Sequence, residues 1–313
     1  MERPISQQSS GGILTDGARV TDRAVKAGWR DYWTLTKPGI NASNLMAAFA
    51  GFWLAGYGAI DYSLLLAMLA GTALVIAGGC SVNNYIDRDI DPLMKRTRDR
   101  PVAAGRIQPL TALWYGIGLF LAGVVLLVAL VNPLTAFLAA IGFVTYVFLY
   151  SAWTKRTTHW NTVVGSVSGA VPPLIGWAAV TGGLEWPAWV LFLFMFVWQP
   201  AHFFALAMMK ADDYREAGIP MLPVVKGFRE TKWQTLIFII LVLPVSLLLF
   251  ATGVVGWLYL VTALVLGVGY LYLALAGWTK ETNDAWARKM FLYSLLYLTV
   301  MQLAMFIDPI LFR

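Results

Sequence analysis

Nine apolar stretches, each roughly 20 residues long, run through this chain, and a segment of that length and composition can cross a lipid bilayer as a helix. Inside lipid, every backbone N–H and C=O group must find its partner within the protein, which favours α-helices. The sequence therefore predicts an all-α polytopic membrane protein with nine transmembrane helices. The expected helices cover roughly residues 38–57, 62–84, 109–131, 133–153, 161–180, 187–208, 234–252, 255–278 and 290–311.

The composition agrees with this class of protein. Hydrophobic residues make up 59% of the chain and charged residues only 13%, about half the charged fraction of an ordinary soluble domain. A net charge of +6 would suggest a nucleic-acid partner in a soluble protein, but here the distribution of Lys and Arg between loops explains it, and no nucleic acid is expected. The single cysteine, Cys80, excludes an intrachain disulfide bond.

The connections between the stretches alternate between basic and nearly uncharged. The N-terminal segment and every second connection contain 22 of the 23 Lys and Arg residues, and the other set contains only Arg313. Because Lys and Arg are enriched in loops that stay in the cytoplasm, we expect the N-terminus and the long loops in the cytoplasm and the C-terminus outside. Residues 1–30 are polar, without a signal-peptide pattern, and are predicted to form a flexible cytoplasmic tail before a single transmembrane domain, 31–313. The tail is short and not rich in Arg, which favours a bacterial cytoplasmic membrane.

A dense cluster of acidic and basic residues, NNYIDRDIDPLMKRTRDRP, occupies residues 83–101, directly after the second apolar stretch. Asn83, Asp87 and Asp91 are spaced by four residues, which places them on one face of a helix that is expected to end near Asp91, before Pro92. Several carboxylates on one face repel one another unless a cation lies between them. Mg²⁺ prefers oxygen ligands and is often shared with substrate phosphates, so the pattern predicts a Mg²⁺ site.

The basic half of the same cluster is suited to binding phosphate oxygens, which Arg can contact through two hydrogen bonds. It contains Lys95, Arg96, Arg98 and Arg100. Acidic and basic halves together predict a Mg²⁺-bridged diphosphate site at the membrane surface. The alternative is an exposed loop of mutually neutralising salt bridges. Asn83 and Asp87 argue against that alternative, because they lie at the end of an apolar stretch, where a polar group is costly unless it has a function.

A second acidic pair, Asp212 and Asp213, follows the sixth apolar stretch. Its basic neighbours are Lys210, Arg215 and Lys226. Two acidic clusters from different helices could face each other and hold two Mg²⁺ ions against one diphosphate, with cations stabilising the leaving group. The fourth stretch ends on the same side with Tyr150, Lys155 and Arg156.

His202 lies near the end of the sixth stretch and has two interpretations. It is either hydrogen-bonded to a neighbouring helix, or it is a general base or a ligand for the metal of an acceptor substrate. A single histidine cannot build a structural metal site. Pro172 and Pro173 lie inside the fifth stretch and are expected to kink that helix.

The first cluster matches the pattern NDxxDxxxD over residues 83–91, with Asn84 where the pattern has Asp. With VPPLIGW at 171–177, WQPAHF at 198–203 and ADDYREAGIPMLPVV at 211–225, the chain after about residue 30 resembles the UbiA superfamily of intramembrane prenyltransferases, and in particular its haem-farnesylating branch. The resemblance implies nine helices around a central cavity. It also implies Mg²⁺-dependent transfer of the farnesyl group of farnesyl diphosphate to a vinyl group of haem B, giving haem O for haem-copper oxidases. Haem A synthase and oxidase assembly proteins are the partners that it suggests.

Together, the residue patterns and the resemblance assign roles to individual side chains. The catalytic set is Asp87, Asp91, Asp213 and Lys155. The metal ligands are Asn83, Asp87, Asp91, Asp212 and Asp213. The diphosphate contacts are Asn83, Asn84, Arg96, Arg100, Tyr150, Arg156, Lys210, Arg215 and Lys226, and the haem contacts are His202 and Trp198.

Three alternatives stay open. A related prenyltransferase would use an aromatic acid or a quinone precursor as acceptor, and Asn84 together with WQPAHF counts against it. A transporter usually places its charges near the bilayer midplane, whereas here the charges gather at one interface. A haem-delivery protein without catalytic activity would not need two acidic clusters.

Overall fold

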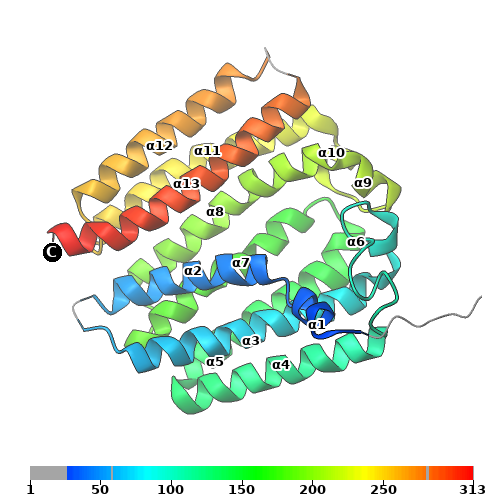
Figure 1. Cartoon of the computed structure of the whole chain (residues 1–313). Helices are drawn as coiled ribbons and strands as arrows, with labels where there is room; N and C mark the ends of the chain where they lie inside the picture. Colours follow the sequence, from blue (N-terminus) through cyan, green and yellow to red (C-terminus); the bar gives the residue numbers. More distant parts are fainter. Residues whose placement is uncertain (1–26, 58, 280–281, 313) are drawn as a thin grey trace, which may run out of the picture.

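The computed structural model describes residues 27–57, 59–279 and 282–312, and in these ranges the chain forms helices and turns without a β-strand. The long helices form a bundle with α6, α9 and α10 near one end and the C-terminus at the opposite end (Figure 1). The long helices are α2 (Pro38–Ala55), α3 (Tyr62–Ile86), α4 (Pro109–Leu130), α5 (Pro133–Val144), α7 (Asn161–Thr181), α8 (Trp186–Met209), α11 (Gly227–Ala251), α12 (Trp257–Ala276) and α13 (Asn283–Phe312). The short elements are α1 (Trp29–Leu35), the 3₁₀ turns η1 (Asp87–Asp89) and η2 (Asp91–Leu93), the π-helix η3 (Thr145–Thr154), α6 (Lys155–Thr157), α9 (Ala211–Glu216) and α10 (Leu222–Val225).

Within the described ranges, eight helical runs are long and apolar enough to cross a membrane. The remaining expected stretch, 38–57, forms α2, which is less apolar because it contains Asn41, Ser43 and Asn44. Asn41 donates a hydrogen bond to the carbonyl oxygen of Ala73 in α3 at 3.0 Å, and Ser43 and Asn44 line an internal cavity. Asn41 thus links α2 to α3, and Ser43, although exposed, borders the cavity together with Asn44. The predicted all-α polytopic fold is confirmed, and each of the nine expected stretches forms a helix.

Local sequence signals determine where these helices begin. Proline occupies the first turn of α2, α4, α5 and α8, where its missing N–H is not needed. Asp61 caps α3 by accepting two backbone N–H groups of the first turn. Asp308, which is buried on α13, accepts the N–H groups of Gly256 and Tyr259 and so caps α12 from a neighbouring helix.

Small residues let α2 and α7 approach each other closely. A Cβ atom on Gly176 of α7 would overlap the carbonyl oxygen of Ala48, and a Cβ atom on Gly51 of α2 would overlap that of Pro173. Lipid is as apolar as the helix surfaces, so helices associate in it mainly through van der Waals contact, which close backbone approach increases. The α2–α7 contact therefore depends on these glycines.

Replacing Gly176 with leucine should force α2 and α7 apart and lower the melting temperature of the detergent-solubilised protein by about 3–10 °C. Gly118→Leu is the matched control, because Gly118 is exposed within α4 and has no atom within 4 Å of the position of a Cβ. That variant should keep its melting temperature or gain slightly, since leucine favours a helix over glycine. Size-exclusion chromatography after heating measures the melting temperature of each variant. A Gly176→Leu variant that melts at the same temperature as the wild type would contradict the close packing of α2 and α7.

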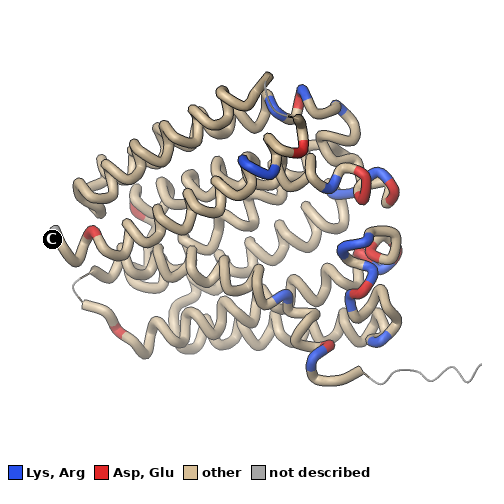
Figure 2. Tube along the Cα trace, turned by 45° about the horizontal axis from the view of Figure 1, so that its top comes forward, with Lys and Arg blue, Asp and Glu red and all other residues tan. Residues whose placement is uncertain are grey.

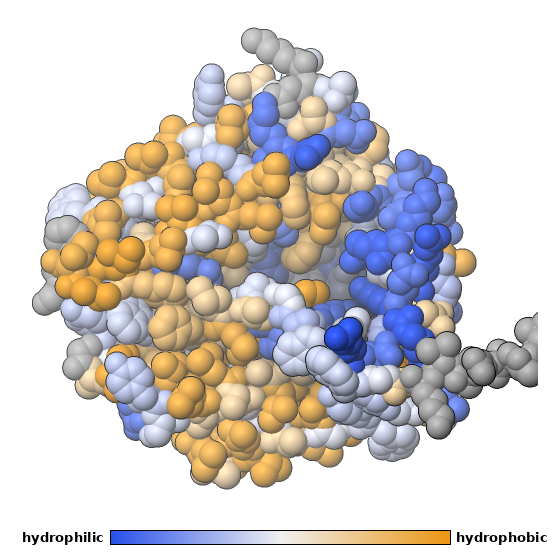
Figure 3. Space-filling model, viewed as in Figure 1, coloured by the Kyte–Doolittle hydropathy of each residue, from blue (hydrophilic) through white to orange (hydrophobic). Residues whose placement is uncertain are grey.

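Charged residues gather at one end of the bundle. Figure 2 shows most Lys, Arg, Asp and Glu residues at the end that carries α6, α9 and α10. Figure 3 shows hydrophobic residues over most of the rest of the visible face. Large apolar side chains are exposed on the long helices, among them Trp114 of α4, which is 66% exposed, as lipid-facing residues are. The chain is a multi-pass membrane protein. Of the tail predicted for residues 1–30, residues 1–26 lie outside the described ranges, and α1 begins at Trp29.

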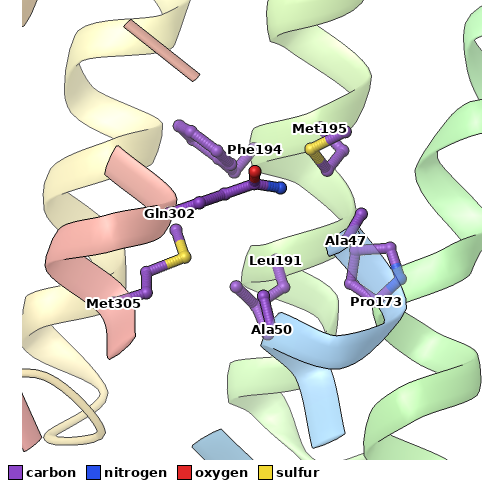
Figure 4. A pocket seen from close by; sticks show the side chains of 8 residues that line it. All are labelled: Ala47, Ala50, Pro173, Leu191, Phe194, Met195, Gln302 and Met305. Atoms are coloured by element: carbon purple, nitrogen blue, oxygen red, sulfur yellow. The ribbon is translucent and has the colours of Figure 1, made fainter. Parts of the chain in front are cut away.

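A small gap lies between α2, α7, α8 and α13, with the side chain of Gln302 directed into it (Figure 4). Its volume is about 10 Å³, which leaves room for no more than one water molecule. Its other lining residues are Ala47, Ala50, Pro173, Leu191, Phe194, Met195 and Met305. This gap is a feature of helix packing and is too small for a substrate.

Candidate active site

A far larger cavity, of about 480 Å³, lies inside the bundle between α2, α3, η3, α7, α8 and α13. This volume is in the range of ligand-binding pockets. Its charged lining residues and several polar ones lie at the charged end: Lys37, Asn83, Asp87, Asp91, Arg96, Arg100, Tyr146, Tyr150 and Lys155. Further into the bundle the lining is mostly apolar or aromatic, with residues such as Val75, Ile175, Trp198 and Leu298, and it also contains Thr72, Gln199 and His202. The cavity thus joins a charged mouth to an apolar interior.

The acidic residues of the first cluster reach this mouth in a way that the sequence did not predict. The expectation of a continuous helix to Asp91 is wrong, because α3 ends at Ile86 and the chain continues as the 3₁₀ turns η1 and η2. Pro92 disfavours the α conformation at Asp91, so the chain tightens there instead of extending the helix. Asn83, Asp87 and Asp91 nevertheless line the same cavity, and each is at most 2% exposed.

Asp87 has the most enclosed carboxylate at the mouth. Its Oδ2 atom accepts hydrogen bonds from Lys155 Nζ at 2.5 Å and from Asn83 Nδ2 at 2.9 Å. Its Oδ1 atom is buried without a hydrogen-bond partner within the described residues, although an Arg156 nitrogen lies 3.7 Å away. A buried carboxylate oxygen without a full partner is costly, and such an oxygen is available to a metal ion.

Asp91 is held by Arg100, whose Nη1 atom lies 2.9 and 2.7 Å from the two carboxylate oxygens. The Thr97 hydroxyl donates to the backbone carbonyl of Asp91 at 2.9 Å, which fixes the loop. Four cationic side chains and two carboxylates are among the residues that line the cavity. The excess of positive charge at the mouth favours an anionic ligand.

Lys37, to which no sequence motif pointed, joins this network through Asn83. Its Nζ atom donates to Asn83 Oδ1, and to the Tyr146 hydroxyl at 3.3 Å. Its backbone is left-handed, with φ 48°, an uncommon conformation for a residue other than glycine that is concentrated at functional sites. Burial lowers the pKa of Lys37 to about 8, and the charge of Arg100 acts in the same direction. The sequence feature that could have identified Lys37 is the placement of a lysine immediately before an apolar stretch.

The π-helix η3 brings aromatic and basic side chains to the same mouth. Tyr146 and Tyr150 line the cavity, and Lys155 follows directly after η3. The Ser151 hydroxyl accepts from Asn83 Nδ2 at 2.9 Å and donates to the carbonyl of Tyr146, five residues back, at 2.9 Å. π-Helical turns occur often at functional sites, because the wider turn re-aims side chains.

The second acidic pair lies on α9, outside the cavity lining. The Asp212 side chain is 87% exposed and pairs with Arg215, and Asp213 is partly exposed. Lys210 and Lys226 are also absent from the cavity lining, whereas their neighbours Tyr214 and Met221 belong to it. Within the described residues, no three His, Cys, Asp or Glu side chains are close enough together to hold a metal. This structure does not bring the two acidic clusters together.

Two other predicted contacts, Asn84 and Arg156, are not among the residues that line the cavity. Asn84 Nδ2 donates to the carbonyl of Cys80 at 2.8 Å and is almost completely buried. Arg156 donates to both carboxylate oxygens of Asp89 at 2.6 and 2.7 Å, and to the carbonyl of Ile86 at 2.7 Å. In this arrangement Asn84 ties down a helix end and Arg156 holds the turn that carries Asp87.

His202 and Trp198 lie side by side on α8 and line the cavity. Their rings are stacked, with centroids 5.0 Å apart. His202 Nδ1 lies 2.7 Å from the hydroxyl of Ser294 on α13, and Trp198 Nε1 donates to the carbonyl of the same serine at 3.0 Å. Both predicted haem contacts therefore share one partner that the sequence analysis did not identify, since Ser294 is 92 residues from His202 along the chain.

Enclosed carboxylates, flanking cations and an apolar cavity inside a helical bundle are what an enzyme needs to bind an anionic head group with a long apolar tail. The family model described as "UbiA prenyltransferase family" matches residues 44–296, and the chain belongs to this family. The structure is similar to that of a digeranylgeranylglyceryl phosphate synthase, with a TM-score of 0.76, 20% identity and 90% of this chain and 98% of the other covered. It is also similar to a UbiA homolog from Archaeoglobus fulgidus bound to DMAPP and Mg²⁺, with a TM-score of 0.68, 15% identity, and coverage of 88% and 99%.

Curated relatives are much closer in sequence. The chain is 51% identical over 284 residues to a protoheme IX farnesyltransferase of Alkalihalophilus pseudofirmus, covering 89% of this chain and 90% of the relative. It is 50% identical over 287 residues to a protoheme IX farnesyltransferase of Bacillus licheniformis, covering 88% and 90%.

Proposed function

We propose that this protein transfers the farnesyl group of farnesyl diphosphate to a vinyl group of haem B, giving haem O and diphosphate. The observation that carries the proposal is the identity of about one half, over nine-tenths of both chains, with relatives named protoheme IX farnesyltransferase. The cavity supports it independently, because a charged mouth leads into an apolar interior lined by Trp198 and His202.

The residues at the mouth fit a divalent metal. Asn83, Asp87 and Asp91 present hard oxygen atoms to one cavity, and Asp87 Oδ1 is a buried oxygen without a hydrogen-bond partner among the described residues. We assign Mg²⁺ to these three residues. The chemistry that Mg²⁺ supplies when bound is neutralisation of the charge that develops on the departing diphosphate.

The cations at the mouth would hold the diphosphate itself. Lys155 and Arg100 neutralise Asp87 and Asp91 in this structure, so both are already placed beside the expected metal ligands. Arg96, Tyr150 and Lys37 line the same mouth and add donors. Asp212 and Asp213, with Lys210, Arg215 and Lys226, are proposed as the second half of the site. The support for this is that Tyr214, on the same short helix, lines the cavity, so that α9 borders it.

The reaction requires that the two substrates be positioned and that water be excluded. It does not require a protein nucleophile. The C1–O bond of farnesyl diphosphate breaks, and its electron pair leaves with the diphosphate. The haem vinyl group supplies the electrons for the new C–C bond, which leaves a cation on the carbon next to the porphyrin, and water adds there as a hydroxyl group and releases a proton. The apolar and aromatic walls keep water from the allylic cation before that bond forms.

We further propose a bacterial cytoplasmic membrane as the location, with the N-terminus and the active-site loops in the cytoplasm. The supporting observations are the distribution of Lys and Arg and the bacterial sources of the relatives. The farnesyl chain and the porphyrin macrocycle are apolar enough to enter the bundle from lipid. Haem A synthase or oxidase assembly proteins remain the proposed recipients of the product.

The test is incubation of the purified protein with haem B, farnesyl diphosphate and Mg²⁺, followed by mass spectrometry. We expect a product with the mass of haem O. A protein that leaves haem B unchanged but prenylates 4-hydroxybenzoate would refute the proposal and identify an aromatic-acid prenyltransferase.

A further inference from the structure

Ser294 on α13 holds the two aromatic side chains at the inner part of the cavity. It is fully buried. Its hydroxyl group contacts His202 and the Tyr270 side chain, and its backbone carbonyl contacts Trp198. His202 is also stacked against Phe291, with ring centroids 4.7 Å apart. The imidazole ring therefore has a fixed position and a fixed plane.

The hydrogen bonds of Ser294 determine which nitrogen of His202 carries the proton. The Ser294 hydroxyl lies 2.6 Å from the carbonyl oxygen of Phe291, and a contact that short between two oxygens requires a hydrogen between them. A serine hydroxyl has a single hydrogen, so it cannot also donate to His202. The hydroxyl must accept instead, and His202 Nδ1, 2.7 Å away, must be the donor.

In neutral imidazole, a proton on Nδ1 leaves a lone pair on Nε2. Nε2 has no hydrogen-bond partner within the described residues, and the ring lines the cavity. His202 lies seven residues before the end of α8, about 10 Å further into the bundle than that end. The lone pair is thus available in the part of the cavity that lies beyond the charged mouth.

We infer that Ser294 is a positioning residue that keeps His202 in the Nδ1–H form, so that Nε2 binds the iron of the porphyrin substrate. This inference rests on the proposed function. A histidine that binds a metal commonly donates its other ring N–H to a neighbouring acceptor, and loss of such an acceptor lowers metal affinity about 10- to 100-fold. Iron ligation by His202 would fix the macrocycle in the cavity and present one edge of it toward the farnesyl diphosphate.

The experiment is titration of the full-length protein in lipid nanodiscs with ferric haem B, monitored by absorption and by pulsed EPR, which detects an imidazole nitrogen bound to iron. We expect the nitrogen signal in the wild type and its loss in His202→Gly, with recovery when imidazole is added. Ser294→Ala should bind haem about 10- to 100-fold more weakly, and Ser294→Thr, which keeps the hydroxyl, should restore binding.

Ser246→Ala is the matched control. Ser246 is a fully buried serine on α11, and its hydroxyl donates to a carbonyl three residues back at 2.7 Å, as that of Ser294 does. This variant should bind haem like the wild type. An unchanged nitrogen signal in a His202→Gly variant that still produces haem O would overturn the binding of iron by His202 but not the proposed function. Failure of Ser294→Thr to restore binding would overturn the role of the hydroxyl, and a wild type that neither binds nor farnesylates haem would overturn the proposed function.

Discussion

Asp87→Asn should reduce turnover by about 1,000-fold, which corresponds to roughly 4 kcal/mol of transition-state stabilisation. The substitution keeps the shape of the side chain but removes the negative charge from the most enclosed carboxylate of the cavity mouth, which is fully buried. An amide oxygen is a weaker ligand for a hard cation than a carboxylate oxygen. Haem O formation by the purified variant at saturating Mg²⁺ measures the effect.

Asp89→Asn is the matched control, because Asp89 lies two residues away and carries the same group but is 58% exposed and pairs with Arg156. We expect it to keep turnover within about threefold of the wild type, as for an exposed ion pair. Asp87→Asn also leaves Lys155 buried without its carboxylate, which is destabilising. The double variant Asp87→Asn/Lys155→Met removes both charges and should recover thermal stability without recovering turnover. Normal activity of Asp87→Asn would refute the assignment of Mg²⁺ to this residue.

Removal of divalent metal with EDTA should lower turnover to background, and excess Mg²⁺ should restore it. The cations that line the mouth, among them Lys155 and Arg100, are proposed to bind the diphosphate but are already paired with carboxylates in this structure. They cannot by themselves neutralise both the carboxylates and a diphosphate that gains charge as it leaves. The rate of haem O formation before and after addition of Mg²⁺ measures the effect.

Ca²⁺ provides the control for this second prediction. It prefers more ligands and longer bonds than Mg²⁺, so it should bind at the mouth but support turnover poorly. Haem binding, followed by absorption, should be unaffected by EDTA, because the proposed metal ligands lie at the mouth and His202 lies further into the bundle. Full activity in EDTA-treated protein would show that the cations of the mouth neutralise the departing diphosphate without a metal ion.

The sequence predicted best those features that depend on one continuous segment of the chain. The nine apolar stretches correspond to helices because burial of backbone hydrogen bonds in lipid leaves few other structures. Asn83, Asp87 and Asp91 line one cavity even though α3 ends at Ile86, because the 3₁₀ turns that follow still face the bundle interior. By contrast, the predicted approach of Asp212 to the first cluster depends on how α9 packs, and this structure leaves that residue exposed.

The sequence by itself determined the class of protein, the family and the acidic cluster, because hydropathy and short motifs are local properties of the chain. Only the tertiary structure decided which groups pair with one another. Lys37 contacts Asn83 across 46 residues, Lys155 contacts Asp87 across 68, and Ser294 contacts His202 across 92. The physical reason is that partner choice inside a bundle follows from helix packing, in which small residues such as Gly176 set how closely two helices approach. The proton inferred on His202 Nδ1 rests on such a contact, since a hydroxyl with one hydrogen must accept where it cannot donate.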